Sequence, residues 1–281
     1  MKISLIITTY NRVELLKNLL ISLKGQDFTP DELIISDDGS SENIVAEIQD
    51  LIKDFKFNIK FVEQADLGFR LARCRNNAVR VAEGDYIIFV DQDLMFSTGF
   101  LREFVNSISE KNVIVGYPIR LNQEQSKKIT FENLLSGDFS DIITESQKNK
   151  ILFQYRKDKF NRFLQSLKIQ KKGTKFRGGI TGMFKKDYLE INGYDENFIG
   201  WGNEDDDFGR RLLAAGIRPI NPFKDVYPLH HWHQEFHNNG ERVNKDYYKK
   251  RKIEINKKNF SAKFGINNSL GNDKIEVIKL K

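Results

Sequence analysis

Short apolar runs alternate with amphipathic segments along the first third of the chain. The runs are rich in isoleucine, leucine and valine, which is typical of strands buried on both faces of a parallel sheet. They predict strands at residues 3–7, 32–36, 59–62 and 86–90. The intervening segments repeat apolar residues at helical intervals and predict helices at 15–23, 44–52 and 71–82. This alternation predicts an α/β fold, with a mostly parallel, Rossmann-like sheet flanked by helices.

Polar side chains follow three of the predicted strands. Residues 8–12 (Thr-Thr-Tyr-Asn-Arg) follow the first strand, and Asp37 and Asp38 end the second. Asp91 and Asp93 end the fourth. Right-handed crossovers place the ends of parallel strands at one edge of the sheet, where open α/β sheets bind ligands. We therefore expect these three groups to converge on one binding site.

Asp91 and Asp93 are separated by one residue, and such close carboxylates repel each other unless a cation lies between them. An exposed turn is one interpretation of the pair. The other is a divalent ion whose shell is completed by diphosphate oxygens.

Residues 229–235 (Leu-His-His-Trp-His-Gln-Glu) hold three of the four histidines of the chain. If this segment is a strand, His231 and His233 share one face and His230 lies on the other. One imidazole could join the carboxylates on a metal, and mixed imidazole and carboxylate ligands suit Mn²⁺ better than Ca²⁺. A surface or stacked histidine cluster is the alternative.

An acidic run at residues 204–207 (Glu-Asp-Asp-Asp) opens a predicted helix that ends near Gly216. Acidic residues there complement the helix dipole, but four in succession exceed what capping needs. Trp201 precedes the run between two glycines. Its indole could stack on the face of a sugar or pack in the core.

The composition suits a folded protein, with 40% hydrophobic and 30% charged residues among 281. The N-terminus does not resemble a signal peptide, Cys74 is the only cysteine, and we expect a cytoplasmic protein. The net charge of +6 is partly local to the C-terminal end, at Lys245, Lys249, Lys250, Arg251, Lys252, Lys257 and Lys258. A solvated helix face is the first interpretation of this run, and peripheral contact with the inner face of the cell membrane is the second. No aromatic platform accompanies it, so no nucleic-acid partner is expected.

In order and spacing, these motifs resemble those of family 2 glycosyltransferases with the GT-A fold. The segments that carry the resemblance are residues 8–12, 37–40, 68–76 and 91–93. Later segments are similar to the chondroitin-polymerase and β-1,4-galactosyltransferase group, at residues 178–179, 193–196, 201–205 and 233–235. Together the matches extend over roughly residues 3–235, and their order makes the set specific.

The resemblance implies a metal site on the donor diphosphate. Asp91 and Asp93 match the pair that holds Mn²⁺, or Mg²⁺, and His233 matches a third metal ligand. The flanking His230 and His231 are alternatives to His233.

The resemblance also implies roles at the acceptor and the nucleotide. Asp205 matches the general base, and we assign Trp201 and Glu204 to substrate binding. The nucleotide-binding residues are expected to be Thr8, Tyr10, Arg12, Asp38, Arg75, Asp91 and Gln92. Asn203 departs from the pattern, because the family usually has a glycine there.

The reaction implied is inverting transfer of a hexose or N-acetylhexosamine, with Gal or GalNAc favoured, from a UDP-sugar to a hydroxyl. The expected acceptor is an oligosaccharide or lipid-linked glycan, in surface polysaccharide or lipopolysaccharide synthesis. The chain would be one large domain: a nucleotide-sugar-binding half (1–122), a helical or loop insertion (123–170), an acceptor-binding and catalytic half (171–235) and a basic C-terminal extension (236–281). An inactive UDP-sugar-binding homologue and a nucleotidyltransferase are the alternatives, although the latter would need a glycine-rich phosphate loop that we do not find.

Overall fold

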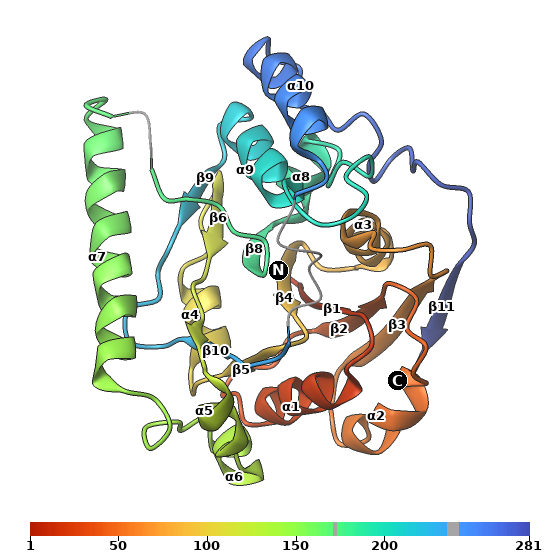
Figure 1. The fold of residues 1–281 in the computed structure, drawn as a ribbon, viewed down its shortest axis with the longest axis vertical. Helices are drawn as coiled ribbons and strands as arrows, with labels where there is room; N and C mark the ends of the chain where they lie inside the picture. The colour runs from red at the N-terminus through yellow and green to blue at the C-terminus, as the bar shows by residue number, and fades with distance from the viewer. Residues whose placement is uncertain (171–172, 235–241) are drawn as a thin grey trace.

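A computed structural model of the chain describes residues 1–170, 173–234 and 242–281. Its main sheet is built from β1 (Ile3–Thr9), β2 (Glu32–Asp37), β3 (Asn58–Gln64), β4 (Tyr86–Asp91), β6 (Asn112–Val115), β8 (Ile180–Phe184), β9 (Arg218–Ile220) and β11 (Ile275–Lys279). The strand order is β11-β3-β2-β1-β4-β8-β6-β9 (Figure 1). The four strands predicted from the apolar runs are β1 to β4.

The centre of the sheet is parallel, as predicted. β1 pairs in parallel with both β2 and β4, and β2 pairs in parallel with β3. The second half of the chain adds antiparallel strands, because β8 runs antiparallel to β4 and β6. β11 also pairs antiparallel, on the outer edge of β3. The whole sheet is therefore mixed.

Helices cover both faces of the sheet (Figure 1). One face is covered by α1 (Val13–Lys24), α2 (Ile44–Ile52) and α4 (Phe100–Asn106), and the other by α3 (Leu71–Val81), α8 (Lys185–Glu190) and α9 (Glu204–Ala214). The predicted helices are α1, α2, α3 and α9.

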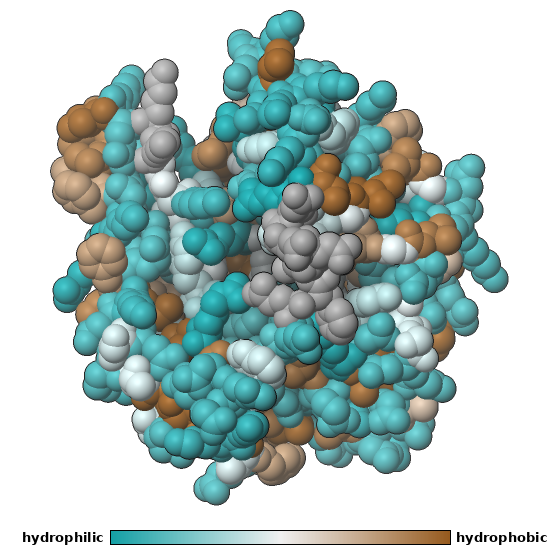
Figure 2. Space-filling model, viewed as in Figure 1, coloured by the Kyte–Doolittle hydropathy of each residue, from teal (hydrophilic) through white to brown (hydrophobic). Residues whose placement is uncertain are grey.

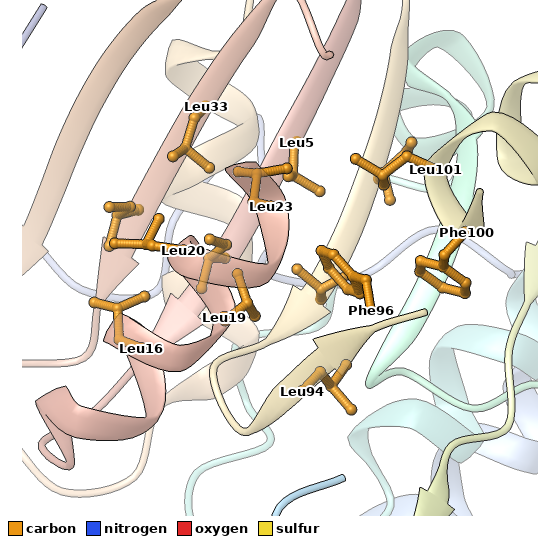
Figure 3. Packing of buried hydrophobic residues seen from close by; sticks show 14 of the residues in the cluster. Leu5, Leu16, Leu19, Leu20, Leu23, Leu33, Leu94, Phe96, Phe100 and Leu101 are labelled. Carbon is orange, nitrogen blue, oxygen red and sulfur yellow. The ribbon is translucent and has the colours of Figure 1, made fainter. Parts of the chain in front are cut away.

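Side chains alternate between two hydrophobic cores along each central strand. In β1, Leu5 and Ile7 belong to the core under α1, whereas Ile6 belongs to the core under α3. Figure 3 shows the leucines of α1 directed at the strands, beside Phe96 and Phe100. This two-sided burial explains why the strands consist of continuous apolar runs.

A smaller sheet and three helices lie beside the main sheet. The small sheet contains β5 (Leu94–Phe96), β10 (Pro228–His230) and β7 (Ile119–Arg120) in that order. Residues 123–170 form α5 (Gln123–Lys127), α6 (Phe131–Ser136) and α7 (Glu145–Ser166). Capping boxes at Asn122, Thr130 and Thr144 define the starts of these helices.

The C-terminal segment packs on the side of the molecule that carries α3 and α9, where Ile266 belongs to the core under α3. α10 (Lys245–Asn256) lies against α9, and the chain then runs along the molecule to β11 (Figure 1). Arg251 differs from the lysines around it, because its side chain is buried and its Nε lies 3.4 Å from the carboxylate of Asp195. It is therefore not part of an exposed basic surface. Within the described residues, no helix is both long and apolar enough to cross a membrane.

Candidate active site

The carboxyl ends of the central strands meet at one edge of the sheet, as predicted. The parallel register places Thr8 opposite Asp91, and the Thr8 hydroxyl donates to the Asp91 carboxylate at 3.2 Å. The Thr9 hydroxyl donates to the side-chain oxygen of Gln92. A cavity of about 580 Å³ opens at this edge.

Nearly all the predicted site residues line this cavity: Thr8, Tyr10, Asp38, Arg75, Asp91, Gln92, Asp93, Trp201, Glu204, Asp205 and His233. Arg12 lies outside the lining. Its guanidinium contacts Nδ1 of His233 at 2.9 Å and donates to the Gln234 carbonyl at 2.9 Å. Segments far apart in the sequence thus form one site.

Asp93 lies against two histidines. Its Oδ2 is 2.9 Å from Nε2 of His233 and 3.3 Å from Nε2 of His230. Burial alone would raise the pKa of Asp93, but the hydrogen bonds from the two imidazoles outweigh it and hold that pKa below its usual value. The segment does not continue as a strand through His233, because β10 ends at His230 and residues 231–234 have no regular secondary structure. As a result His230 and His233 share a side, while Nδ1 of His231 contacts the Trp232 carbonyl oxygen.

These three side chains fit a divalent metal. The ligand atoms of Asp93, His230 and His233 all lie within 4.8 Å of one another. Metal–ligand bonds of about 2.1 Å at right angles separate neighbouring ligand atoms by about 3 Å, close to the contacts seen here. A set of two imidazoles and one carboxylate suits Mn²⁺ or another transition metal better than Ca²⁺. The Asp91 carboxylate is turned toward Arg75 and Thr8 instead.

Arg75 contacts both Asp91, a predicted metal ligand, and Asp205, the predicted general base. It projects from α3 and is only 1% exposed. One guanidinium nitrogen donates to Asp91 at 3.1 Å, and the other donates to Asp205 at 2.9 Å and to the Tyr194 hydroxyl at 3.0 Å. The planar fork of arginine can hold two carboxylates in fixed positions, which the point charge of lysine cannot.

Two glycines just before β8 leave room for these carboxylates. A Cβ added at Gly178 would lie 1.9 Å from the Asp205 carboxylate, and one added at Gly179 would lie 2.6 Å from that of Asp91. The Gly178 N–H also donates to Asp205 at 3.0 Å. The predicted site residues did not include Gly178, Gly179 or Tyr194. All three lie in segments that carry the family resemblance, the glycine pair at 178–179 and the Gly-Tyr-Asp-Glu motif at 193–196, so these motifs could have pointed to them.

The acidic run opens α9, as predicted, at the wall of the cavity. The Asp205 side chain is 34% exposed, whereas Glu204 is buried. Burial, and then repulsion from Asp205, raises the pKa of Glu204 to about 7. The Glu204 carboxylate accepts from the Gly202 N–H at 2.9 Å. Both carboxylates therefore line the cavity, but Glu204 is the more deeply buried of the two.

Asn203, the departure from the family pattern, has a left-handed backbone with φ of 73°. This conformation favours glycine, and asparagine is among the residues that tolerate it best. The substitution therefore keeps the turn that places Glu204 and Asp205. Its side chain donates to Asp206 at 3.1 Å.

The remaining predicted residues surround the cavity mouth and floor. The Tyr10 hydroxyl donates to Asp66 at 3.2 Å, and the residue is 42% exposed. Asp38 accepts from the Arg70 N–H at 2.8 Å, and burial raises its pKa to about 6. Trp201 lines the cavity, with the Arg242 guanidinium 5.9 Å from the centre of its ring.

Comparison with known proteins agrees with this geometry. Residues 4–189 match the model of glycosyl transferase family 2, and residues 158–245 match that of the N-terminal domain of galactosyltransferase. The chain is 29% identical over 245 residues to a chondroitin synthase of Escherichia coli, covering 83% of this chain and 34% of that protein. It thus spans about a third of that relative.

A second relative is the GalNAc(5)-diNAcBac-PP-undecaprenol beta-1,3-glucosyltransferase of Campylobacter jejuni, 30% identical over 201 residues that cover 71% of this chain and 56% of that one. Among solved structures, GalNAc-T7 with UDP, GalNAc and Mn²⁺ superposes with a TM-score of 0.61 at 14% identity, covering 91% of this chain and 49% of that chain. The likeness supports the same fold. Because the family model matches well over half of its residues, the chain belongs to glycosyl transferase family 2 and is a glycosyltransferase with the GT-A fold.

Proposed function

We propose that the chain catalyses inverting, divalent-metal-dependent transfer of a hexose or N-acetylhexosamine from a UDP-sugar to a hydroxyl of a glycan. The observation that carries the proposal is one cavity lined by a metal-ligand cluster and by a separate carboxylate. The cluster is Asp93, His230 and His233, and the separate carboxylate is Asp205. A displacement reaction needs these two functions at different places in one site.

The donor would bind at the strand ends. Asp93, His230 and His233 would hold the metal, and Asp91 remains a predicted further ligand. The bound ion would supply charge stabilisation for the diphosphate as it leaves. The nucleotide would lie over Thr8, Tyr10, Asp38 and Gln92, which line the same end of the cavity, with Arg12 behind His233. GalNAc-T7, which shares the fold, has been solved with UDP and Mn²⁺.

The acceptor would bind between Trp201 and α9. Its hydroxyl oxygen would form a bond to the anomeric carbon as the bond to the diphosphate oxygen breaks. The hydroxyl proton would pass to Asp205, whose carboxylate is positioned by Arg75, Tyr194 and the Gly178 N–H. Because attack and departure are on opposite faces of the sugar, the anomeric configuration inverts.

The transferred sugar is proposed to be galactose or N-acetylgalactosamine. Residues 158–245 match a galactosyltransferase domain model, and a chondroitin synthase is among the relatives. The acceptor is proposed to be a growing oligosaccharide, with a lipid-linked one supported by the name of the Campylobacter relative. The setting would be surface polysaccharide or lipopolysaccharide synthesis in the cytoplasm.

A panel of UDP-sugars tests the proposal. The protein would be incubated with UDP-Gal, UDP-GalNAc, UDP-Glc and UDP-GlcNAc, with Mn²⁺, and release of UDP would be measured with and without oligosaccharide acceptors. We expect turnover of UDP-Gal or UDP-GalNAc that depends on Mn²⁺. Tight UDP binding with no turnover of any donor would indicate an inactive sugar-nucleotide-binding homologue instead.

A further inference from the structure

Helix α7 contacts the rest of the protein along only one side. Its buried residues are Ile151, which packs in the core beside the small sheet, and Asp158, which accepts from the Asn221 amide at 3.1 Å. Figure 1 shows the helix standing along one side of the molecule, at left. The opposite side of the helix therefore faces outward.

That outward side carries an apolar stripe. Phe153, Phe160 and Leu167 follow one another at seven-residue intervals and are 67%, 60% and 53% exposed. At about 100° per residue, they lie within about 40° of one another around the helix axis. Phe163, also exposed, is next to them. Single exposed apolar residues are ordinary, but a stripe along one helix face indicates a contact surface. Figure 2 shows hydrophobic residues along the outer side of α7.

Basic side chains flank the stripe. Four exposed basic residues of α7 lie on either side of it: Lys150, Arg156, Lys157 and Lys159. Among the described residues, no carboxylate lies within ion-pairing distance of these four. The acidic residues of α7 are Glu145 in its first turn and the buried Asp158. The outer surface of α7 is therefore both apolar and strongly positive.

We propose that α7 docks the protein on an anionic lipid surface, which goes beyond the proposed function. Phenylalanine and leucine side chains enter the boundary between headgroups and acyl chains, while lysine and arginine contact anionic headgroups. Pairing of α7 with a second copy of this chain is disfavoured, because it would bring two such cationic surfaces together. The basic C-terminal helix α10 is a weaker candidate, since Ile253 is its one large, highly exposed apolar side chain.

Vesicle flotation tests this surface. We expect the full chain to float with vesicles of equal parts phosphatidylcholine and phosphatidylglycerol, and not with phosphatidylcholine alone. The double variant Phe153→Ser/Phe160→Ser should bind the anionic vesicles at least about tenfold more weakly. The matched control is Phe131→Ser/Leu135→Ser on α6, which removes two exposed apolar side chains elsewhere and should bind like wild type.

Two charge-reversal double variants test the same surface without changing the phenylalanines. Arg156→Glu/Lys157→Glu on α7 should abolish flotation, whereas Lys250→Glu/Lys257→Glu, with the same charge change at the C-terminal end, should leave most of it. Flotation that is absent in the wild type, unchanged in the α7 variants, or lost only in the C-terminal variant would overturn the proposal. So would sedimentation showing a dimer that Phe160→Ser dissociates. Transfer to a soluble acceptor should be unchanged in every variant, so failure here is distinguishable from failure of the proposed function.

Discussion

The two halves of the cavity are built in different ways. In the half at the strand ends, the parallel register of β1 and β4 sets Thr8 against Asp91, so the backbone ladder fixes which side chains meet. In the other half, Asp205 comes from the first turn of α9, and Trp201 comes from the loop that precedes this helix. The first half depends on strand geometry, whereas the second depends on turns.

Arg75 joins these halves. Its buried fork holds Asp91 on the strand side and Asp205 on the turn side, with Tyr194 as a third partner. A turn alone fixes a side chain less firmly than a sheet does. The charge-assisted hydrogen bonds of Arg75 supply the additional restraint on Asp205. The comparison therefore predicts that the metal half and the base half can be disrupted separately, and that Arg75 couples them.

Removal of the metal should have the largest effect. We expect EDTA to abolish sugar transfer and added Mn²⁺ to restore it, because the leaving diphosphate would lose its charge stabilisation. Release of UDP from the preferred donor measures the effect. Transfer that continues unchanged in EDTA would contradict a metal site in the half of the cavity at the strand ends.

A pair of histidine variants locates that metal. His233→Ala should weaken activation by Mn²⁺ by about tenfold or more, since it removes one ligand. His231→Ala is the matched control, because its ring is turned to the Trp232 carbonyl and away from Asp93. Equal losses in the two variants would count against the assignment.

Arg75→Lys tests the coupling of the halves. A lysine cannot hold Asp91 and Asp205 together, so we expect kcat/KM to fall by about 100-fold, an estimate based on the loss of buried bidentate contacts. Thermal unfolding of the variant provides the control for folding. Wild-type turnover in a stably folded Arg75→Lys protein would show that the two halves are independent of this cation.

Glu204→Gln should change stability in a pH-dependent way. Burial raises the pKa of Glu204 in the folded protein to about 7, above its ordinary value, so folding favours the protonated form. As pH rises from about 4.5 to about 7, ionisation of Glu204 therefore lowers the free energy of unfolding of the wild type by at most about 3 kcal/mol. Relative to wild type, the glutamine variant should gain about that much in free energy of unfolding between pH 4.5 and pH 8. A difference that does not vary with pH would mean that Glu204 ionises normally.

Asn203→Gly should have the smallest effect. Glycine adopts the left-handed backbone at this position without strain, but it loses the hydrogen bond to Asp206. We expect the free energy of unfolding to change by less than about 1 kcal/mol and transfer to be retained. Denaturant unfolding checks the first value. A large loss of activity would show that the asparagine side chain itself serves the acceptor site.

The same contrast explains how much could be predicted from the sequence. β1 to β4 were predicted because residues such as Ile6 and Phe89 form continuous apolar runs, and their parallel pairing made Thr8 and Asp91 neighbours. The antiparallel pairing of β8 with β4 and β6 could not be predicted, because pairing between segments so far apart in the sequence depends on the whole fold. None of the residues of β11 is fully buried, so the strand lacks the continuous apolar run that marks β1 to β4.

Where side chains come from loops and helix starts, their presence in the site could be predicted from the sequence, but their arrangement could not. The acidic run pointed to Asp205, but only the structure shows that Glu204 is the buried neighbour. A strand through this segment would have placed His230 and His233 on opposite faces. Because β10 ends at His230, the two imidazole rings instead lie next to each other. Arg75 was expected at the nucleotide, and its place between two carboxylates follows from the packing of α3, which no local pattern encodes.

We expect donor binding and proton removal to depend on different halves of the cavity. Asp205→Asn and Asp93→Asn, compared for UDP affinity in Mn²⁺ and for sugar transfer, test it most directly. We predict that Asp205→Asn binds UDP like wild type but transfers sugar about 10²- to 10⁴-fold more slowly, whereas Asp93→Asn loses UDP affinity. Unchanged transfer by Asp205→Asn, or loss of UDP binding in that variant, would contradict the account.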